Sequence, residues 1–402
     1  MRLLVFNAGS SSLKFDLLDV AGSGPVSRVI AGVFVDAADG SGELRLETGG
    51  RPAETPGAIR TLAAAAEFVL TWLGEPAAHG TSLLTGLTAT VHRIVHGGEA
   101  FRATTRLGAR ELDELARLDG LAPLHNPPAR SVIAAVRARL GADTPVIGVF
   151  DTAYYAGLPE ACWRYAVPPR WYEDFGVRRY GFHGTAHRYL CRVGRARVPP
   201  GRPASRVISL QLGRGCSVTA TLEERAVATS MGFTPLEGLV MGTRCGDLDP
   251  GALLHVMERA GLTPAAMRAA LNNDSGLKGL SGGCADMQEL LRREHQGDAG
   301  AALAIEIFCR RARHYLGAYM HELGGVDLIA FGGGIGEHAP QIRRRILQGL
   351  EWAGIALDPG ANLASRDGSI AATGSRAAIE VVRVDEASVM ADETAALLKG
   401  AA

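Results

Sequence analysis

The chain of 402 residues carries 42 basic and 42 acidic side chains, so its formal net charge is zero. This balance argues against nucleic acid or an anionic membrane as the main partner. With 47% hydrophobic and 21% charged residues, the composition is that of a globular protein, which excludes a mainly disordered chain. The length predicts two or three domains, and no apolar run reaches the roughly 18 residues that a membrane-spanning helix needs.

The first part of the chain predicts strands that alternate with helices. Residues 3–16 (LLVFNAGSSSLKFD) are typical of two strands joined by a glycine–serine turn. An alanine-rich helix is predicted over 57–73, a strand over 88–96, a helix over 127–140 and a buried strand over 145–150. We expect a domain boundary near residue 152, where the last of these strands has ended.

The second part predicts the same alternation, which indicates an α/β fold. A surface loop over 198–205 precedes a second hairpin, VISLQLGRGCSVTA (207–220). Helices are predicted to begin at Asp249-Pro250 and Thr263-Pro264 and to cover 298–323 and 387–399, with strands at 206–211, 218–222, 327–331 and 379–384. The hairpins 3–16 and 207–220 favour two halves built on one plan, with two unrelated hairpins as the alternative.

Two glycine-rich turns are candidates for binding phosphate. The turn from Asn7 to Lys14 offers backbone N–H groups, three hydroxyls, an amide and an ammonium, which suit a polyphosphate with its metal ion. Lysine is otherwise present only at Lys278 and Lys399. The turn GGGIGEH follows the strand 327–331 and leads into a helical segment, APQIRRRILQGL. A serine-rich hairpin turn and a plain loop are the alternatives.

Polar residues near strand ends are candidates for chemistry. In HRIVHGG (92–98), Arg93 and Val95 are predicted to share one face of a strand, which suits a small carboxylate with a short alkyl tail, or a carboxylate that meets a phosphate. A structural ion pair of Arg93 is the alternative. Asp151 follows a strand at the edge where α/β proteins bind ligands.

Loop residues add further candidates. His125 lies at a predicted helix entry and His183 just before another helix, and each has a structural role as its alternative. Arg244 lies between Gly242 and Gly246 in the long glycine-rich loop 232–250, where the backbone can approach a ligand closely.

Taken together, NAGSSSLKF, HRIVHGG, LAPLHNP, VFDTAY, YGFHGTAH, MGFTPLEGLVMGTRCGDLDP and GGGIGE resemble the acetate kinase family, in its order and over nearly the whole chain. The resemblance implies two duplicated α/β domains of the actin and hexokinase type (ribonuclease H-like), with ATP in the cleft between them. It implies an N-terminal domain of residues 1–152 plus 386–402 and a C-terminal nucleotide-binding domain of residues 153–385. It also implies a homodimer.

The resemblance further implies roles for single residues. Arg93, Arg244 and His183 would surround the transferring phosphoryl group, and Asp151 is the family's proposed acid or base. Acetate is already ionised at pH 7, so we expect Asp151 to orient Arg93, Arg244 or metal-bound water instead. Mg²⁺ (or Mn²⁺) would be held by Asn7 and Glu386, and Val95, Leu124, Phe182 and Pro235 would line the acyl pocket together with Arg93. ATP would contact Ser10, Ser12, Lys14, Gln211, Leu212, Gly213, Arg214, Gly215, Asp286, Met287, Gln288, Gly334, Ile335, Gly336, Glu337 and His338.

The departures from the family pattern lie on the nucleotide side. Gln211 stands where the family has histidine, Arg214 where it has asparagine, and Gln288 where it has arginine. The family's GIGEN ends here at His338, and its ARET is replaced by ADET at 391–394. We expect Arg214 either to raise the affinity for a polyphosphate or to pair with Glu386 or Glu337.

The predicted activity is reversible, Mg²⁺-dependent phosphoryl transfer from ATP to acetate by a cytoplasmic enzyme. The six cysteines are spread singly without a CxxC pair, and the N-terminal segment lacks the features of a signal peptide. Three alternatives stay open: a kinase that prefers propionate or butyrate, a sugar or polyol kinase that uses Asp151 as its base, and an ATP-binding regulator without catalysis.

Overall fold

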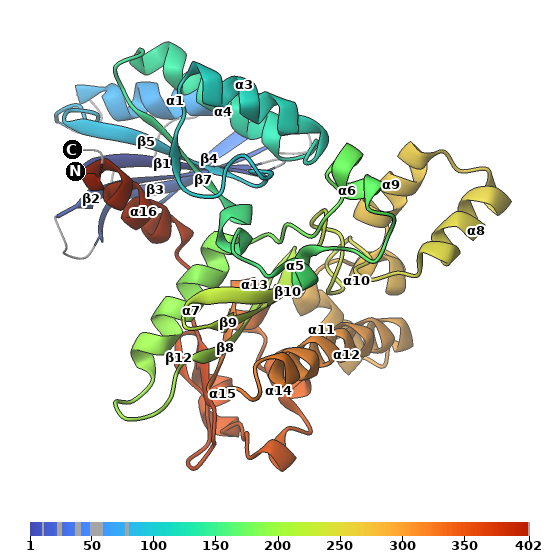
Figure 1. The fold of residues 1–402 in the computed structure, drawn as a ribbon. Coiled ribbons are helices and arrows are strands. Elements are labelled where there is room, and N and C mark those ends of the chain that lie inside the picture. The colour runs from blue at the N-terminus through green and yellow to red at the C-terminus, as the bar shows by residue number, and fades with distance from the viewer. Residues whose placement is uncertain (10–11, 22–25, 37–41, 49–58, 77–79, 401–402) are drawn as a thin grey trace. The chain divides into compact units, whose positions relative to one another are not determined.

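The computed structural model describes residues 1–9, 12–21, 26–36, 42–48, 59–76 and 80–400 (Figure 1). The chain divides into two compact units, Met1–Tyr154 with Asp385–Ala402, and Tyr155–Val384. Each unit has a mixed sheet with helices on it, so the predicted α/β class is confirmed.

The sheet of the first unit has the strand order β4-β3-β2-β1-β5-β7-β6. Strands β1 to β4 are antiparallel neighbours, whereas β1, β5 and β7 run parallel. The bounds are β1 (Arg2–Ala8), β2 (Ser12–Val20), β3 (Val26–Asp36), β4 (Gly42–Thr48), β5 (Leu87–Ile94), β6 (Thr105–Arg106) and β7 (Val146–Phe150).

Helices cover both faces of this sheet. Leu4 and Phe6 of β1 pack with α1 (Leu62–Gly74) and α4 (Asn126–Leu140), while Leu3 and Val5 pack with α16 (Glu386–Gly400). Strand residues alternate between the two faces, so β1 is apolar on both sides and reads as a continuous hydrophobic run. Two short elements follow β6, α3 (Ala109–Arg117) and η1 (Leu118–Gly120), and η2 (Asp151–Tyr155) follows β7.

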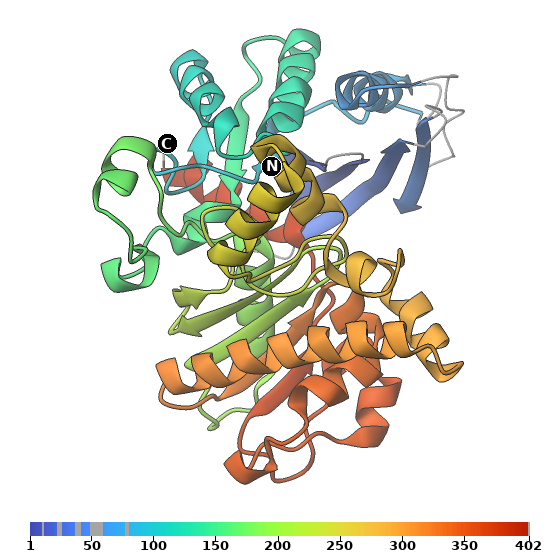
Figure 2. The same ribbon diagram turned by 90° about the vertical axis from the view of Figure 1, so that its right-hand side faces the viewer.

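The sheet of the second unit has the order β10-β9-β8-β11-β13-β12. Helix α7 (Gly184–Arg197) packs on one face through Leu190 and Cys191, and α12 (Ala299–Glu322) contacts β8 and β9. Figure 2 shows α12 as the long orange helix beside this sheet. The strands are β8 (Arg206–Leu212), β9 (Cys216–Leu222), β10 (Arg225–Thr229), β11 (Leu328–Gly332), β12 (Gly368–Ser369) and β13 (Ala378–Val381).

The remaining helices of this unit include α8 and α9, each of which begins with a capping side chain and a proline. Asp249 and Thr263 cap α8 and α9 by accepting hydrogen bonds from Gly251 N (2.8 Å) and Ala266 N (3.2 Å), so both predicted helix starts are confirmed. The elements are α5 (Glu160–Trp163), α6 (Arg170–Phe175), α8 (Pro250–Ala260), α9 (Pro264–Asn273), α10 (Gly276–Leu280), α11 (Met287–His295), α13 (Gly333–His338), α14 (Pro340–Leu347), η3 (Glu351–Ala353) and α15 (Pro359–Ala364).

The two sheets share one topology. In β3-β2-β1-β5-β7 and in β10-β9-β8-β11-β13, three antiparallel strands are followed by two parallel ones. The hairpins β1–β2 and β8–β9 occupy equivalent places. The prediction of two halves built on one plan is therefore confirmed.

Some predicted boundaries are wrong. The strand expected to reach residue 96 ends at Ile94, because Gly97 and Gly98 follow and Gly98 has a φ of 58°. GGGIGEH was expected as a turn but forms α13 from Gly333 onward. Strands β3, β4 and β10 were not predicted. No helix in the described ranges combines the length and apolar character needed to cross a bilayer.

Candidate active site

In the first unit, polar side chains gather where three neighbouring parallel strands end. Asn7 is near the end of β1, Arg93 near the end of β5, and Asp151 directly follows β7. Because β1, β5 and β7 are adjacent and parallel, their carboxyl ends share one sheet edge. Residues far apart in sequence thus meet at the place where α/β proteins bind ligands.

Arg93 is held from several sides. Its Nε and Nη2 donate to Oδ1 and Oδ2 of Asp151 at 2.9 and 2.6 Å, and its Nη1 donates to Asn7 Oδ1 at 3.1 Å. The Asp151 side chain is only 1% exposed. Burial alone would lower the pKa of Arg93, but the carboxylates of Asp151 and Glu386 outweigh it and raise this pKa above its usual value. The guanidinium is therefore charged and fixed in orientation.

Glu386 joins this cluster from the first turn of α16. Asn7 Nδ2 donates to Glu386 Oε2 at 3.3 Å, and Arg93 Nε lies 3.6 Å from Glu386 Oε1. The preceding residue, Asp385, accepts a hydrogen bond from Ser388 N (3.2 Å) and pairs with Arg28 (2.8 Å). These contacts fix the helix start and hence Glu386. Sequence analysis did not identify Arg28, because no local pattern links it to residue 385.

The donor set here fits a hard divalent cation. Mg²⁺ is usually bound by one or two carboxylates with water and substrate phosphate, and Glu386 with the amide oxygen of Asn7 supplies such oxygens. Lys14 lies opposite Asn7 in the β1–β2 register, and its side chain is exposed. Ser12 begins β2, whereas the predicted Ser10 lies outside the described residues. Within the described residues, no group of three or more His, Cys, Asp or Glu side chains is placed to hold a metal ion.

In the second unit, His183 has a constrained backbone. It is the N-cap of α7 with φ 60° and ψ 28°, a left-handed conformation that is uncommon outside glycine. The Tyr155 hydroxyl donates to the carbonyl of Phe182 at 2.8 Å. A Cβ on Gly181, which has a φ of 78°, would lie 2.5 Å from the Tyr155 ring. The tyrosine thus holds the segment that presents His183.

His183 and Arg244 face the same turn between β8 and β9. A Cβ built on Gly215 would lie 3.3 Å from His183 Nε2 and 3.8 Å from Arg244 Nη1, so a larger residue would press on the imidazole. Arg244 Nη1 also donates to the carbonyl of Pro235 at 3.2 Å. Burial lowers the pKa of Arg244, and among the described residues no carboxylate pairs with it. An anion beside Gly215 would meet both a cation and an imidazole.

The loop that carries Pro235 and Arg244 is braced by a carboxylate that sequence analysis did not identify. Glu237 accepts a hydrogen bond from Arg179 Nη2 at 2.5 Å and another from the Tyr165 hydroxyl. Arg179 Nη1 also donates to backbone carbonyls, including that of Met231 at 3.1 Å. The only signal in the sequence was an acidic residue within a glycine-rich loop.

A second carboxylate, Asp247, holds the C-terminal part of the same loop through hydrogen bonds and an ion pair. It accepts hydrogen bonds from Gly238 N at 2.8 Å and from the Tyr315 hydroxyl at 3.0 Å, and it pairs with Arg311 at 3.0 Å. Burial and this carboxylate raise the pKa of Tyr315. The loop is therefore ordered despite its lack of helices and strands.

A pocket of about 650 Å³ opens beside the β8–β9 turn. Next to the lining residue Gly334, Gly333 has a φ of 77°, and a Cβ there would lie 2.6 Å from the carbonyl oxygen of Leu212, so glycine lets α13 start close to β8. Of the residues predicted to contact nucleotide, Gly213, Arg214, Asp286, Met287, Gln288, Gly334, Ile335 and His338 line this pocket. Sequence analysis missed Ala285, Leu291, Ala339, Pro340, Gln341 and Arg366, which line it too.

Other residues predicted to contact the nucleotide are buried or form hydrogen bonds within the protein. Leu212 and Gly336 are buried. Glu337 Oε1 accepts hydrogen bonds from Gly333 N and Val384 N, each at 3.2 Å, so Glu337 does not pair with Arg214. Gln211 has a buried Oε1 with no hydrogen-bond partner in the described part of the chain.

The predicted acyl residues are divided between the units. Val95 and Leu124 belong to the first unit, where Val95 is 9% and Leu124 53% exposed. Phe182 and Pro235 belong to the second, where Phe182 is buried and Pro235 is half-buried. Val95 lies beyond the end of β5 rather than within a strand as predicted.

Comparisons with known proteins agree with these observations. The acetokinase family model matches residues 2–392. Acetate kinase of Solibacter usitatus is 42% identical over 411 aligned positions, which cover 100% of this chain and 99% of that protein. The crystal structure of Porphyromonas gingivalis acetate kinase superposes with a TM-score of 0.88 at 34% identity, covering 99% of each chain. A propionate kinase structure from Francisella tularensis also gives a TM-score of 0.88, at 32% identity and 98% of each chain.

The likeness extends over the full length of the relatives, and it agrees with the duplicated two-domain topology of the actin and hexokinase type. This chain therefore belongs to the acetokinase family and is a phosphotransferase with a carboxylate acceptor.

Proposed function

We propose that the chain transfers the γ-phosphoryl group of ATP to acetate, reversibly, and forms acetyl phosphate and ADP. The observation that carries the proposal is the meeting of His183 and Arg244 at Gly215, where Arg244 has no carboxylate partner among the described residues. The transferring phosphoryl group spreads negative charge over its equatorial oxygens. A guanidinium and an imidazole fixed before the reaction stabilise this charge without reorganising.

Nucleotide binds in the pocket beside this turn. Gly213 and Arg214 of the β8–β9 turn line it, together with residues of α13 and of the start of α11. Arg214 is exposed and has no ion pair within the described ranges, which supports a direct contact with the polyphosphate. Asn7 and Glu386 hold Mg²⁺ or Mn²⁺, and Lys14 contacts the phosphates. The cation neutralises part of the charge on the phosphates when it is bound.

Acetate is bound through Arg93. Its carboxylate is ionised at neutral pH and needs no base before it attacks phosphorus. Asp151 is therefore a positioning residue: its two hydrogen bonds orient the Arg93 guanidinium. In this proposal Arg244 contacts the phosphoryl group, and Val95, Leu124, Phe182 and Pro235 contact the acyl methyl, as the family resemblance implies.

A propionate preference is the second candidate, since the propionate kinase structure is as similar in fold as the acetate kinase structure. One methylene changes binding in an apolar pocket by only about 1–3 kcal/mol. Values of kcat/KM for acetate, propionate and butyrate decide between the two acceptors.

The experiment is a hydroxamate assay with ATP, Mg²⁺, acetate and hydroxylamine. Acetyl hydroxamate is expected from the unaltered chain and not from Arg93→Ala or Arg244→Ala, while Arg344→Ala, an exposed arginine on α14, retains activity. Absence of hydroxamate with all three acids, together with phosphorylation of a sugar, would instead establish the polyol kinase. Nucleotide binding without any phosphorylated product would establish that the chain is an ATP-binding regulator without catalysis.

The enzyme is further proposed to be a cytoplasmic homodimer. All six cysteines are free thiols, which supports a reducing compartment.

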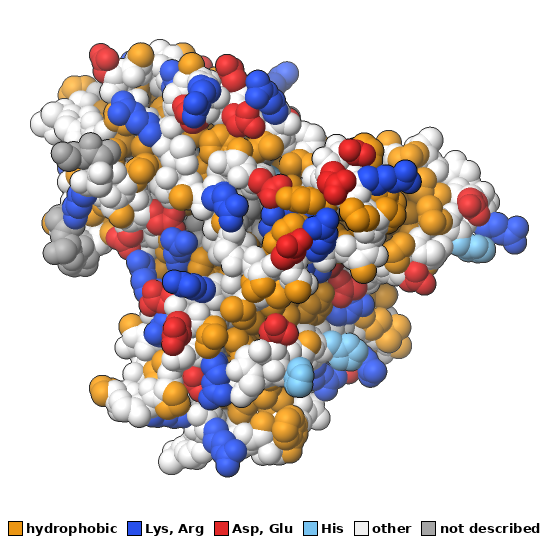
Figure 3. Space-filling view, in the orientation of Figure 1, with side chains coloured by type: hydrophobic (Ala, Val, Ile, Leu, Met, Phe, Trp, Pro, Cys, Tyr) orange, Lys and Arg blue, Asp and Glu red, His pale blue; other side chains and the backbone are white. Residues whose placement is uncertain are grey.

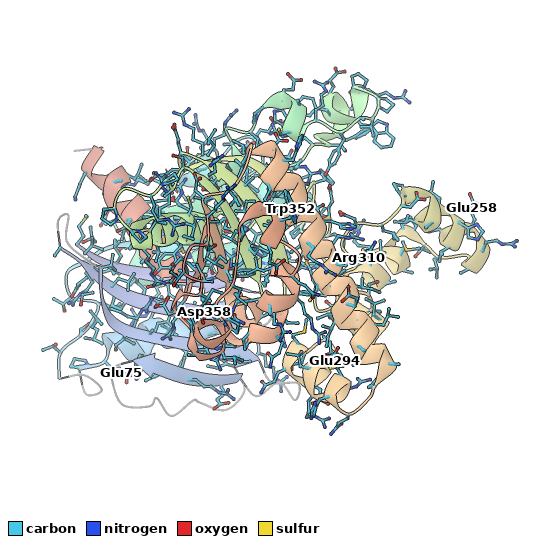
Figure 4. All side chains as sticks on the ribbon, turned by 90° about the horizontal axis from the view of Figure 1, so that it is seen from below. Glu75, Glu258, Glu294, Arg310, Trp352 and Asp358 are labelled. Atoms are coloured by element: carbon cyan, nitrogen blue, oxygen red, sulfur yellow. The ribbon has the colours of Figure 1, made fainter. Side chains whose placement is uncertain are left out.

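The proposed dimer has a candidate surface. Hydrophobic side chains gather at the surface over α8 and α9 (Figure 3), where Leu254 and Val256 are 59% and 45% exposed. Glu258 extends from the outer part of α8 (Figure 4). The molar mass in solution tests the dimer.

A further inference from the structure

A line of alternating imidazole and hydroxyl groups lies behind His183. Its Nδ1 is 2.8 Å from Ser217 Oγ, which is 2.7 Å from His187 Nε2, and His187 Nδ1 is 2.7 Å from Ser209 Oγ. Ser217, His187 and Ser209 are all 0% exposed. The proposed chemistry uses only His183, so the three buried groups have no role assigned in it.

The fold brings these groups together from three elements. His183 and His187 are four residues apart at the start of α7 and thus share one side of that helix. Ser209 lies on β8 and Ser217 on β9, in adjacent antiparallel strands. The imidazole of His187 is therefore enclosed between the helix and the sheet.

Two arrangements of the hydrogen atoms in this line leave a hydrogen on His183 Nε2. Burial, with a smaller contribution from His183, lowers the pKa of His187 well below its usual value, so this ring is neutral and has one donor and one acceptor nitrogen. When Ser209 donates to His187 Nδ1, His187 Nε2–H donates to Ser217, whose hydroxyl then donates to His183 Nδ1. A neutral His183 in this arrangement carries its hydrogen on Nε2, the atom that faces Gly215.

The same groups also accept a charged His183. With His183 protonated, Nδ1–H donates to Ser217, Ser217 donates to His187 Nε2, and His187 Nδ1–H donates to Ser209. No heavy atom has to move between the two arrangements, because a hydroxyl both donates and accepts. In both of them His183 retains a hydrogen on Nε2.

We infer that Ser217 and His187 are positioning residues, which keep the Nε2–H of His183 directed at the phosphoryl group in either charge state of that ring. The inference rests on the proposed function for the role of His183. Ser209 completes the line by satisfying the far nitrogen of His187. Thr221, four positions after Ser217 on the same face of β9 and equally buried, makes none of the three contacts of the line and serves as a matched control.

The first test is kinetic. Ser217→Ala is expected to lower kcat about tenfold or more while KM for ATP and acetate stays within about twofold, because, of its two lost hydrogen bonds, the one to His183 acts on a group that engages the transition state. Ser217→Thr, which keeps the hydroxyl, restores most of kcat. Thr221→Val leaves kcat unchanged. Equal losses in Ser217→Ala and Thr221→Val, or a loss that appears only in KM, overturn the inference.

The second test does not depend on activity. With ¹⁵N-labelled histidine, NMR of the unaltered chain at pH 7 is expected to show His187 neutral and His183 with a hydrogen on Nε2. Ser217→Ala changes the ring signals of both residues, and Thr221→Val changes neither. Finding neutral His183 with its hydrogen on Nδ1 overturns the inference even if every variant is unstable. If the unaltered chain makes no acyl phosphate, the proposed function fails instead, and the NMR result still decides the hydrogen positions.

Discussion

Arg343 offers a sharp test of what holds the nucleotide pocket in shape. It lies on α14, is 0% exposed and donates to Asn362 Oδ1 (2.8 Å), Asn362 O (2.6 Å), Gly336 O (2.7 Å) and Glu337 O (2.9 Å). Asn362 belongs to α15, which Asp358, labelled in Figure 4, caps by accepting from Ala361 N at 2.7 Å. One guanidinium thus joins α13, α14 and α15.

Replacing Arg343 with methionine keeps an apolar stem of similar shape but leaves three buried oxygen atoms and the part-buried carbonyl of Glu337 without these donors. Each unsatisfied buried acceptor costs about 1–3 kcal/mol. Part of this loss is offset, because the buried guanidinium is itself unfavourable; burial, with nearby Arg366, lowers its pKa to about 10. We expect a net loss of about 3–5 kcal/mol in the free energy of unfolding, which is the low end of what these unsatisfied acceptors cost together.

The assay is urea unfolding, with Arg344→Met as the control. Arg344 is the next residue of the same helix but is exposed, so its replacement should change the free energy of unfolding by less than about 0.5 kcal/mol. Because the units need not unfold together, the comparison uses the transition of the second unit. KM for ATP should also rise in Arg343→Met, since α13 carries Gly334 and Ile335 of the pocket. A difference below about 1 kcal/mol between the two variants would refute the reasoning.

Three further outcomes follow from the site and the buried histidines. Asp151→Asn should lower kcat by a similar factor at every pH, since Asp151 orients Arg93 rather than transferring a proton; normal activity at high pH with a loss at low pH would show a titrating role instead. Arg214→Asn should raise KM for ATP and for pyrophosphate, because Arg214 is proposed to contact the polyphosphate. Unchanged KM values would show that this contact is not made. Burial lowers the pKa of His92 to about 3, so the native ring stays neutral while the unfolded one binds a proton below about 6.5. The free energy of unfolding therefore falls as the pH drops below about 6.5, by about 2 kcal/mol between pH 7 and 5 from this group. His92→Gln should reduce that pH dependence in urea unfolding.

Residue patterns predicted those parts of the fold that depend on short stretches of chain. The helices that begin at Asp249-Pro250 and Thr263-Pro264 follow from a capping side chain and a proline within the first turn, and the structure has both. Asp151 was predicted at a strand end because VIGVF is apolar throughout. By contrast, β3 and β4 were missed, because their interrupted apolar pattern gives no clear period.

The contacts inside the site could not be predicted in the same way. No pattern around residue 237 indicates that Glu237 receives Arg179 and Tyr165, or that these contacts fix the loop of Arg244. The line from His183 through Ser217 to His187 was equally invisible, since serine on a buried strand is ordinary. Arg366 was missed because it lies in a loop whose sequence carries no ligand motif.

By itself the sequence determined the class of fold, the duplicated plan and the residue types available to an anion, since turns, caps and apolar periods act over a few neighbouring residues. Tertiary structure alone decided which of those residues meet: Arg93 with Asp151 and Asn7 in one unit, and His183 with Arg244 in the other. The physical reason is that these contacts depend on the register of adjacent strands and on the packing of helices against them, and both are set by interactions between segments far apart along the chain.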